Sequence, residues 1–464
     1  KSRLLRAFQH SLGAAERIRV RWHCSPYHQT TANFPAIEQI RRNLGTDAQS
    51  DDRCLDALET MVTELGLDPE IVVPSLAILL SLPLHDRYSL PDWSQNELKR
   101  RLFSAQIELL EAAARNAPVL FLIEDLHWAD PTSLEVIGEI IVAIRSARVL
   151  IVMTARPEFD PTWTELPHAT VHRLNSLSRN ETMALVNSFV QALGLSSEVT
   201  DQIVERSDGV PLFVEELARS LLESTSDAGI PASVQDSLMA RLDRLGAAKE
   251  LAQFASVVGR VFRVDDLEVL AHHSLAEVAK GLQVLVDTGL VYKKANGFYE
   301  FKHALVRDAA YASMLRTKRR DLHARYAEHL NTSDARTYQP EFLARHYLEA
   351  GMHEEAVTIW MQAGSKALDR WAVVESVSNF RAALESLSLL SQTLERRQTE
   401  VDINVLLGQA LIALEGMGHE APRAAFERAV CLSSELADER RQISALRGLG
   451  KCQFSSEPAQ AVRT

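Results

Sequence analysis

The chain has 464 residues, 46% of them hydrophobic and 24% charged, as is typical of a soluble globular protein with about three domains. Its formal net charge of −12 argues against broad binding to nucleic acid or anionic membranes, although not against a local basic patch. No apolar run approaches the roughly 18 residues that cross a bilayer, and no signal peptide is seen. A cytoplasmic protein without a membrane partner is therefore expected.

The chain starts with Lys1-Ser2 and runs directly into a stretch with Leu4, Leu5 and Phe8 at helical spacing. A phosphate-binding P-loop ends in Lys-Ser or Lys-Thr and continues into a helix. Its lysine reaches the β- and γ-phosphates, and its hydroxyl reaches Mg²⁺. Lys1 and Ser2 are interpreted as the end of such a loop, whose glycines and preceding strand lie upstream. The alternative is a terminus whose side chains are merely solvated.

Residues 18–24 alternate apolar and polar side chains, which predicts a strand near the edge of a sheet. Helices are expected from residue 35 onward and over 97–115. His23 and His28 are candidate metal ligands, although solvated or hydrogen-bonded histidines are the preferred interpretation. The four cysteines lack metal-binding spacing and are expected to be buried or incidental reduced thiols.

Residues 119–123 are consecutive large apolar residues, too few for a buried helix but typical of a strand covered on both faces of a parallel sheet. This strand ends in Glu124 and Asp125. A helix with Asp130 as N-cap and Pro131 in its first turn follows. Ligands bind at the carboxyl ends of such strands, so this acidic pair can hold a hydrated Mg²⁺ and polarise a water. The pattern indicates a Walker B element; the alternative is a buried strand that happens to end in acids.

Residues 149–153 predict a second buried strand, which ends in a polar threonine and Arg156. An arginine at this edge can bridge phosphate oxygens and stabilise developing charge, or it can pair with an acidic helix. Residues 171–174 predict a last short strand, before a helix over 181–193. Further on, Gly209 offers a turn and Pro211 a helix start.

In the second half, residues 234–258 predict two helices, and 282–292 predict a helix, a glycine stop and a strand. A tight turn at 296–297 and a return strand over 298–301 complete a winged helix. Such a domain raises a DNA-binding hypothesis. The basic cluster at 318–320 lies beyond the wing and the chain is acidic, so a nucleic-acid partner is not expected.

From about Pro340 the chain consists of helical hairpins, with turns at Gly351 and near Gly416. Small residues alternate with aromatic ones, which indicates a degenerate tetratricopeptide-like array; Armadillo-like helix pairs are the alternative. The array is expected to bind a protein partner. It stops at Thr464 without a polar capping helix, so the chain is expected to be truncated at both ends, to lack the middle strand of its sheet, and to bind ATP weakly or not at all.

Six stretches together resemble the STAND class of signal-transduction NTPases, a branch of the AAA+ group. They are KSRLL, CSPYHQ, IEDLHWADPTSLE, TARPEF, DGVPLFVEEL and FKHALVRDAAY. The resemblance is greatest to the ATPase module of multidomain class III adenylate/guanylate cyclases, and similar modules occur in regulators of the maltose-activator and LuxR type.

This resemblance implies ATP and Mg²⁺ as cofactors and ATP or ADP as bound partners. It implies that Lys1 and Ser2 are the Walker A remnant, that Ser2 and Glu124 are metal ligands, and that Asp125 activates the attacking water. It also makes Arg156 a sensor-type residue. Glutamate precedes aspartate here, the reverse of the commonest order in the family.

In the second half, the resemblance implies that Gly209 and Pro211 form the turn beside the adenine and that His303 touches the bound diphosphate. On the residues alone, His303 is as well explained by a histidine that caps the following helix.

The expected fold is an α/β P-loop NTPase domain with a parallel sheet, then an α-helical and winged-helix domain, then an α-helical repeat solenoid. The expected segments are an ATPase core (1–175), a helical lid (176–230), a winged helix (231–335) and the repeats (336–464). The expected function is a slow, switch-like ATPase in a multidomain signalling protein of the cyclase type, with any cyclase activity outside these residues. The alternatives are a LuxR-type transcriptional activator and a scaffold with a vestigial ATPase site.

Overall fold

The computed structural model describes residues 1–13, 17–45, 51–84, 87–88, 93–190, 197–223, 233–271, 274–294, 297–332 and 339–456. The chain divides into two compact units. The first comprises Lys1–Val171, Leu330–Leu348 and Met352–Thr464, and the second comprises His172–His329 and Glu349–Gly351. This division is coarser than the four expected segments, whose boundaries stay predictions.

The first unit contains a parallel sheet of three strands, β1 (Ile18–His23), β2 (Val119–Glu124) and β3 (Val149–Met153), in the order β1-β2-β3. The acidic strand β2 lies in the middle and is buried along its whole length, while β1 lies at an edge, as predicted. The strands are contiguous, so no gap divides the described sheet. The expectation that the full sheet has a further strand, upstream of Lys1, stays a prediction.

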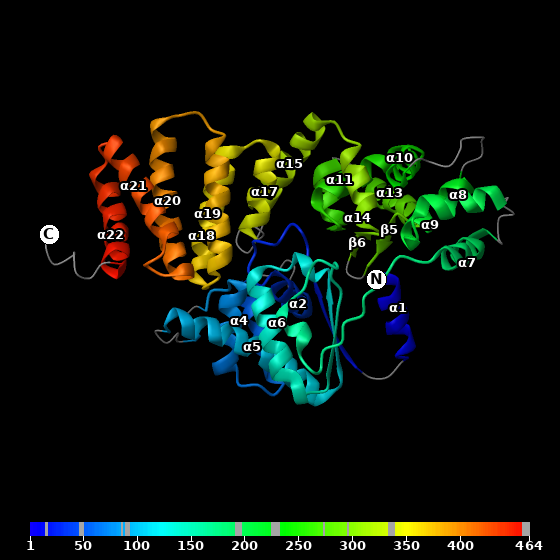
Figure 1. Cartoon of the computed structure of the whole chain (residues 1–464), viewed down its shortest axis with the longest axis horizontal. Helices are drawn as coiled ribbons and strands as arrows, with labels where there is room; N and C mark the ends of the chain where they lie inside the picture. The colour runs from blue at the N-terminus through cyan, green and yellow to red at the C-terminus, as the bar shows by residue number, and fades with distance from the viewer. Residues whose placement is uncertain are drawn as a thin grey trace. The chain divides into compact units, whose positions relative to one another are not determined.

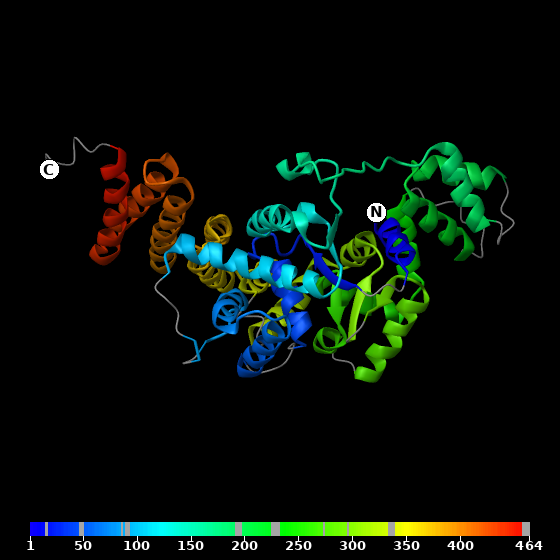
Figure 2. The ribbon, with the colours of Figure 1, turned by 90° about the horizontal axis from the view of Figure 1, so that it is seen from below.

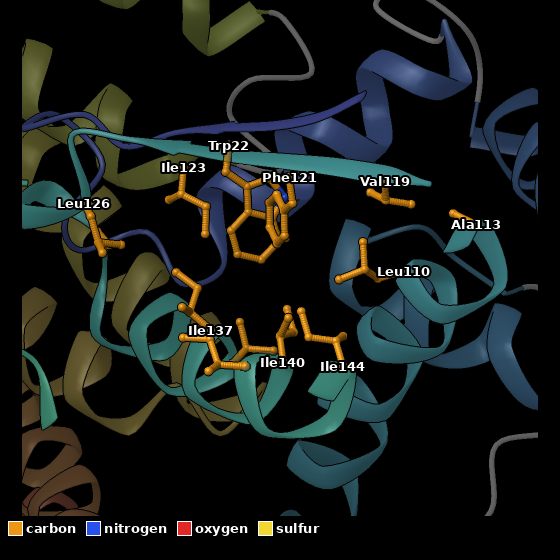
Figure 3. Packing of buried hydrophobic residues seen from close by; sticks show 14 of the residues in the cluster. Trp22, Leu110, Ala113, Val119, Phe121, Ile123, Leu126, Ile137, Ile140 and Ile144 are labelled. Carbon is orange, nitrogen blue, oxygen red and sulfur yellow. The ribbon is translucent and has the colours of Figure 1, made fainter. Parts of the chain in front are cut away.

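One face of the sheet packs on α5 (Gln95–Asn116) and α6 (Pro131–Ala143). Figure 3 shows Trp22 and Phe121 pointing from the strands toward Ile137 and Ile140 of α6. The rings of Trp22 and Phe121 meet edge to face, with centroids 5.0 Å apart, a favoured aromatic geometry. Packing in this apolar layer fixes the position of the acidic C-terminal end of β2 relative to α6.

The other face of the sheet is covered by α1 (Ser2–Ser11), whose Leu5 packs on Leu120 and Leu122 of β2. The alternate side chains of β2 therefore enter two different cores, which explains its unbroken apolar run. A further core joins α5 to α2 (Phe34–Leu44), α3 (Asp51–Glu64) and α4 (Pro69–Leu80).

The predicted strand over 171–174 is wrong. These residues are described and have no regular secondary structure, and both Val171 and Leu174 are exposed. Two apolar residues in alternation indicate a strand only where a neighbouring strand offers hydrogen bonds and a core. Here the described residues provide neither.

The repeats are six consecutive helices: α17 (Pro340–Ala350), α18 (His353–Asp369), α19 (Val373–Ser388), α20 (Leu394–Glu415), α21 (Glu420–Glu435) and α22 (Glu439–Ser456). Each of α18 to α21 packs on the helix that follows it (Figures 1 and 2). A Cβ on Gly364 would lie 2.6 Å from the ring of Phe380, and one on Gly408 would lie equally close to Phe426. The glycines thus admit aromatic rings from the next helix, which confirms the predicted stacked helix pairs.

The second unit contains the helices α7 (Arg179–Val190), α8 (Ser197–Ser207), α9 (Pro211–Glu223), α10 (Val234–Asp243), α11 (Ala247–Val258), α12 (Val264–Ala271), α13 (Leu275–Asp287), α14 (Ala304–Ala312) and most of α15 (Arg316–Thr332). Its antiparallel sheet has the order β4-β6-β5, with β4 at Val261–Arg263, β5 at Val291–Lys293 and β6 at Phe298–Phe301. The predicted hairpin β5–β6 is present, although its turn residue Asn296 lies outside the described residues. The third strand, β4, was not predicted, because three residues carry too little pattern. The winged-helix assignment stays a prediction.

Over the described ranges, every helix is too short or too polar to span a membrane. The cysteines of these ranges form no disulfide: Cys24, Cys54 and Cys452 are buried, and Cys431 is exposed. Burial, aided by the charges of Asp130 and Asp125, raises the pKa of the Cys24 thiol, so this group stays protonated and unreactive.

Glu341 of α17 is buried, and its Oε2 accepts a hydrogen bond of 3.2 Å from Thr31 Oγ1. Burial raises the pKa of this carboxyl to about 7, although the nearby charges of Arg370 and Lys366 lower it. Between the unfolded pKa near 4.5 and this value the folded state binds more protons. The contribution of Glu341 to the free energy of unfolding therefore falls as the pH rises through this window.

Replacing Glu341 by Gln should consequently stabilise the first unit relative to wild type at pH 8, by on the order of 1–3 kcal/mol. The difference should shrink toward pH 5, where the wild-type carboxyl is protonated. Urea denaturation at both pH values measures it, with the exposed Glu355→Gln as control. A difference that does not depend on pH would contradict the shifted pKa.

Candidate functional site

The carboxyl ends of β2 and β3 are joined by Thr154. Its amide donates to the carbonyl of Ile123 (2.9 Å), and its own carbonyl accepts from the amide of Leu126 (2.8 Å). Its hydroxyl Oγ1 accepts from the amide of Asp125 at 3.0 Å. These bonds hold Asp125 in a left-handed conformation (φ 56°). Aspartate adopts this conformation more readily than most non-glycine residues, and the bonds to Thr154 fix it there, so the fold sets the position of this carboxylate.

Four charged or polar side chains lie near this edge of the sheet: Lys1, Asp125, His127 and Arg156. Lys1 Nζ donates to the carbonyl of Ala155, directly after β3. Burial lowers the pKa of His127, the Asp125 carboxylate raises it, and the charges of Arg156 and Lys1 lower it further. Asp125, Arg156 and Lys1 therefore all lie within electrostatic range of His127. The structure thus brings Lys1 together with Asp125 and Arg156, as the sequence predicted.

Glu124 has a different environment from Asp125. Nε and Nη2 of Arg21 on β1 both lie 2.6 Å from its Oε1, and Glu124 is 7% exposed. One oxygen of the predicted metal ligand is thus engaged in an internal ion pair. The sequence did not predict this role of Arg21, because it depends on the register of β1 and β2, in which His23 pairs with Glu124 and Arg21 lies two residues earlier on the neighbouring strand.

Arg156 is exposed, and its guanidinium carbon lies 5.4 Å from the ring centroid of Trp128, which is a cation–π distance. Across the described residues, no carboxylate lies within ion-pair distance of Arg156, so the alternative of an acidic-helix partner is not observed. Stacking on Trp128 holds the guanidinium beside the strand ends without neutralising its charge. Such an arginine can still bind an anion.

The described ranges contain no group of three His, Cys, Asp or Glu side chains that could hold a metal ion by itself. Mg²⁺ commonly takes one or two carboxylates together with substrate phosphates and waters, so the adjacent carboxylates of Glu124 and Asp125 at the end of β2 suit that ion. Ser2 begins α1, and its side chain lies outside the described residues. The ring of His28 stacks on Phe34 at 3.6 Å, and burial lowers its pKa to about 3, which makes it a packing residue.

Gly209, Pro211 and His303 belong to the second unit. Gly209 has φ 66°, and its carbonyl accepts from the amide of Leu177 at 2.8 Å; Pro211 then begins α9. A left-handed turn directly before a proline start is the helix boundary that the sequence predicted.

His303 is the N-cap residue of α14, but its side chain makes no capping hydrogen bond, so the capping alternative is not observed. The neighbouring Lys302 Nζ pairs with the carboxylate of Glu215 on α9. Burial raises the pKa of that carboxylate, but Lys302, Arg219 and His303 lower it overall. The second unit therefore brings α9, which begins at Pro211, together with the segment that carries His303.

Gly209 tolerates no side chain, because a Cβ there would lie 2.2 Å from the carbonyl oxygen of Leu177. Gly297 also has a positive φ, of 76°, but an added Cβ would meet open space. Gly209→Ala should therefore destabilise the second unit by about 1–3 kcal/mol more than Gly297→Ala does. Thermal unfolding of both variants measures the difference, and equal losses would mean that this backbone contact is absent in solution.

Residues 1–152 match the family model of the AAA ATPase domain. The AAA-like region thus starts at Lys1, includes the whole of β2 with Glu124, continues through Asp125 and ends within β3. The match implies nucleotide and magnesium binding in general, together with a capacity for ATP hydrolysis. It also agrees with the observed parallel sheet, so the predicted fold class is confirmed.

Two further proteins are similar over most of this chain. An uncharacterised protein of Rhizobium meliloti (strain 1021) is 27% identical over 448 residues, which cover 93% of this chain and 43% of that protein. This chain therefore spans less than half of the relative's length. A crystal structure of a signal transduction ATPase with numerous domains (STAND) protein with a tetratricopeptide repeat sensor, from Pyrococcus horikoshii, aligns with a TM-score of 0.42 at 13% identity, over 98% of this chain and 68% of that one. Neither similarity names a cyclase or a LuxR-type regulator.

Proposed function

We propose that the AAA-like region binds ATP with Mg²⁺ at the carboxyl edge of the β1-β2-β3 sheet and hydrolyses it slowly, as a switch. The observation that carries this proposal is the grouping of Lys1, Asp125, His127 and Arg156 at the ends of β2 and β3. Two cations beside a carboxylate suit a polyphosphate with its metal ion, because the cations meet phosphate oxygens while the carboxylate faces the metal or the attacking water.

The residues have distinct proposed roles. Lys1 and Arg156 would bind phosphate oxygens, and Asp125 would orient the attacking water and accept its proton. Ser2 and Glu124 stay the proposed metal ligands, and the bound Mg²⁺ would neutralise charge on the phosphates. The ion pair of Glu124 with Arg21 favours Asp125 as the acid with the larger share of the chemistry. The roles of Gly209, Pro211 and His303 rest on the resemblance of their motifs.

The proposed context is a multidomain signalling protein of the cyclase type, in which the repeats bind a protein partner. The motifs IEDLHWADPTSLE and DGVPLFVEEL support this context, and the greater length of the Rhizobium meliloti relative is compatible with further domains. Any cyclase activity would reside outside residues 1–464.

A second candidate is a scaffold whose ATPase site is vestigial. The bond between Arg21 and Glu124 favours it, because an internal ion pair at the metal position competes with a bound cation. This candidate predicts that nucleotide has no measurable effect on the protein.

Titration of the full-length protein with a fluorescent ATP analogue separates the two candidates. Wild type and the control Glu139→Gln, an exposed position on α6, should bind saturably and only with Mg²⁺. The double variant Glu124→Gln with Asp125→Asn should bind at least ~10-fold more weakly, since two charged hydrogen-bonding groups are lost. Absence of binding in wild type, or equal binding in the double variant, would contradict the proposed function.

A further inference from the structure

Two segments leave the carboxyl edge of the sheet beside the proposed site: the loop after β1 and the turn that opens α6. The carboxylate of Asp130, 1% exposed, joins them. Its Oδ1 accepts from the amides of Asn33 (2.9 Å) and Ser133 (2.8 Å), and its Oδ2 accepts from Ser133 Oγ at 2.6 Å. Asp130 is thus the predicted N-cap of α6 and also the anchor of the β1–α2 loop, a link that no local pattern indicates.

Helix α19 of the repeats reaches the same turn. Glu375, which is also 1% exposed, accepts a hydrogen bond of 2.8 Å from the amide of Thr132 through Oε1. Its Oε2 is buried without a hydrogen-bond partner among the described residues. Burial and the charge of Glu375 together raise the pKa of Asp130 to about 7, and burial raises the pKa of Glu375 as well.

Helix α17 holds the other segment. Glu341 accepts from Thr31, and Arg345 Nη1 donates to the carbonyl of Pro26 at 3.1 Å. The guanidinium of Arg345 also lies 4.7 Å from the ring centroid of Tyr27. The repeats therefore bind both segments through polar groups, and two of the partners, the Thr132 amide and the Pro26 carbonyl, are backbone atoms, so these contacts fix the position of the chain itself.

The contact between α19 and the turn of α6 contributes little to the free energy of folding for the area that it buries, because it contains two buried acids. Two buried acids that face each other are costly, and apolar side chains of similar volume commonly stabilise such a contact more. The hydrogen bonds instead specify where the turn of α6 and the β1–α2 loop lie relative to the acidic end of β2, which is the part of the fold that the proposed function uses.

We propose that Glu375 is a positioning residue of the nucleotide site. Its bond to Thr132, together with the bonds of Asp130 to Asn33 and Ser133, fixes the turn of α6 and the β1–α2 loop beside the acidic end of β2. A displacement of α19 in the repeats therefore alters nucleotide affinity. This inference rests on the proposed function and assigns to the site a regulating element within its own unit. Glu341 and Arg345 of α17 support the same loop.

The test compares three variants of the full-length protein by titration with a fluorescent ADP analogue. Glu375→Ala should raise the Kd about fivefold or more, the lower end of usual coupling between sites, whereas Glu375→Gln should stay within about twofold, because its amide oxygen still accepts from Thr132. Glu385→Ala, at an exposed position of α19, is the matched control and should not change the Kd. Amide hydrogen exchange at Asn33, Thr132 and Ser133 should rise in Glu375→Ala only.

Binding that is equal in wild type and Glu375→Ala would overturn the inference alone, whether or not amide exchange increases. Failure of wild type to bind nucleotide would overturn the proposed function and the inference with it. Should Glu375→Ala not fold, Glu375→Asp decides, because its shorter side chain cannot reach Thr132: a Kd equal to that of wild type would contradict the positioning role.

Discussion

Replacing Asp125 by Asn is expected to lower the rate of ATP hydrolysis about 10²–10⁴-fold, the usual contribution of a positioned proton acceptor. Asparagine matches aspartate in size and tolerates the left-handed backbone of this position, so the amide bond to Thr154 Oγ1 should remain. Nucleotide affinity should therefore change far less than turnover. Phosphate release under single-turnover conditions measures the effect.

The exposed Glu139→Gln on α6 controls for the loss of one carboxylate in the same region and should keep wild-type turnover. A variant of Asp125 that hydrolyses ATP at the wild-type rate would show that Glu124, or a group outside these residues, activates the water.

Phe121→Ala is expected to lower the free energy of unfolding of the first unit by about 3–5 kcal/mol, because it leaves a cavity where a fully buried ring packs on Trp22. Leu150→Ala on the neighbouring strand is the control: its side chain is 51% exposed, so a loss within about 0.5 kcal/mol is expected. Denaturant-dependent hydrogen exchange of the β2 amides reports this unit separately from the second one. Equal losses in the two variants would contradict the two-sided core around β2.

Local patterns predicted the parts of the fold that are decided locally. The apolar run of residues 119–123 requires two covered faces, and α1 and α6 provide them. Asp130 with Pro131 marks the start of α6, since a cap needs only the next few residues. The repeat helices follow from small and aromatic residues at helical spacing. In the site, the Walker-type motifs predicted the grouping of Lys1, Asp125 and Arg156.

Contacts between distant residues were not predictable. Arg21 and Glu124 are 103 positions apart, and their ion pair depends on strand register. From the sequence, Glu375 and Glu341 are expected on exposed helix faces, because acidic side chains are rarely buried without a partner. Their burial against Thr132 and Thr31 arises only when the repeats pack on the loop and helix beside the sheet.

Amide hydrogen exchange of the full-length protein with and without Mg²⁺ and ATP tests the central claim most directly. Bound nucleotide should protect the amides of residues 125–128, after β2, and of residues 154–156, after β3, because the proposed phosphate site lies between these strand ends. Protection should be absent without Mg²⁺. Saturating ATP that leaves both segments unprotected, or that protects only segments away from this edge, would contradict the proposed site.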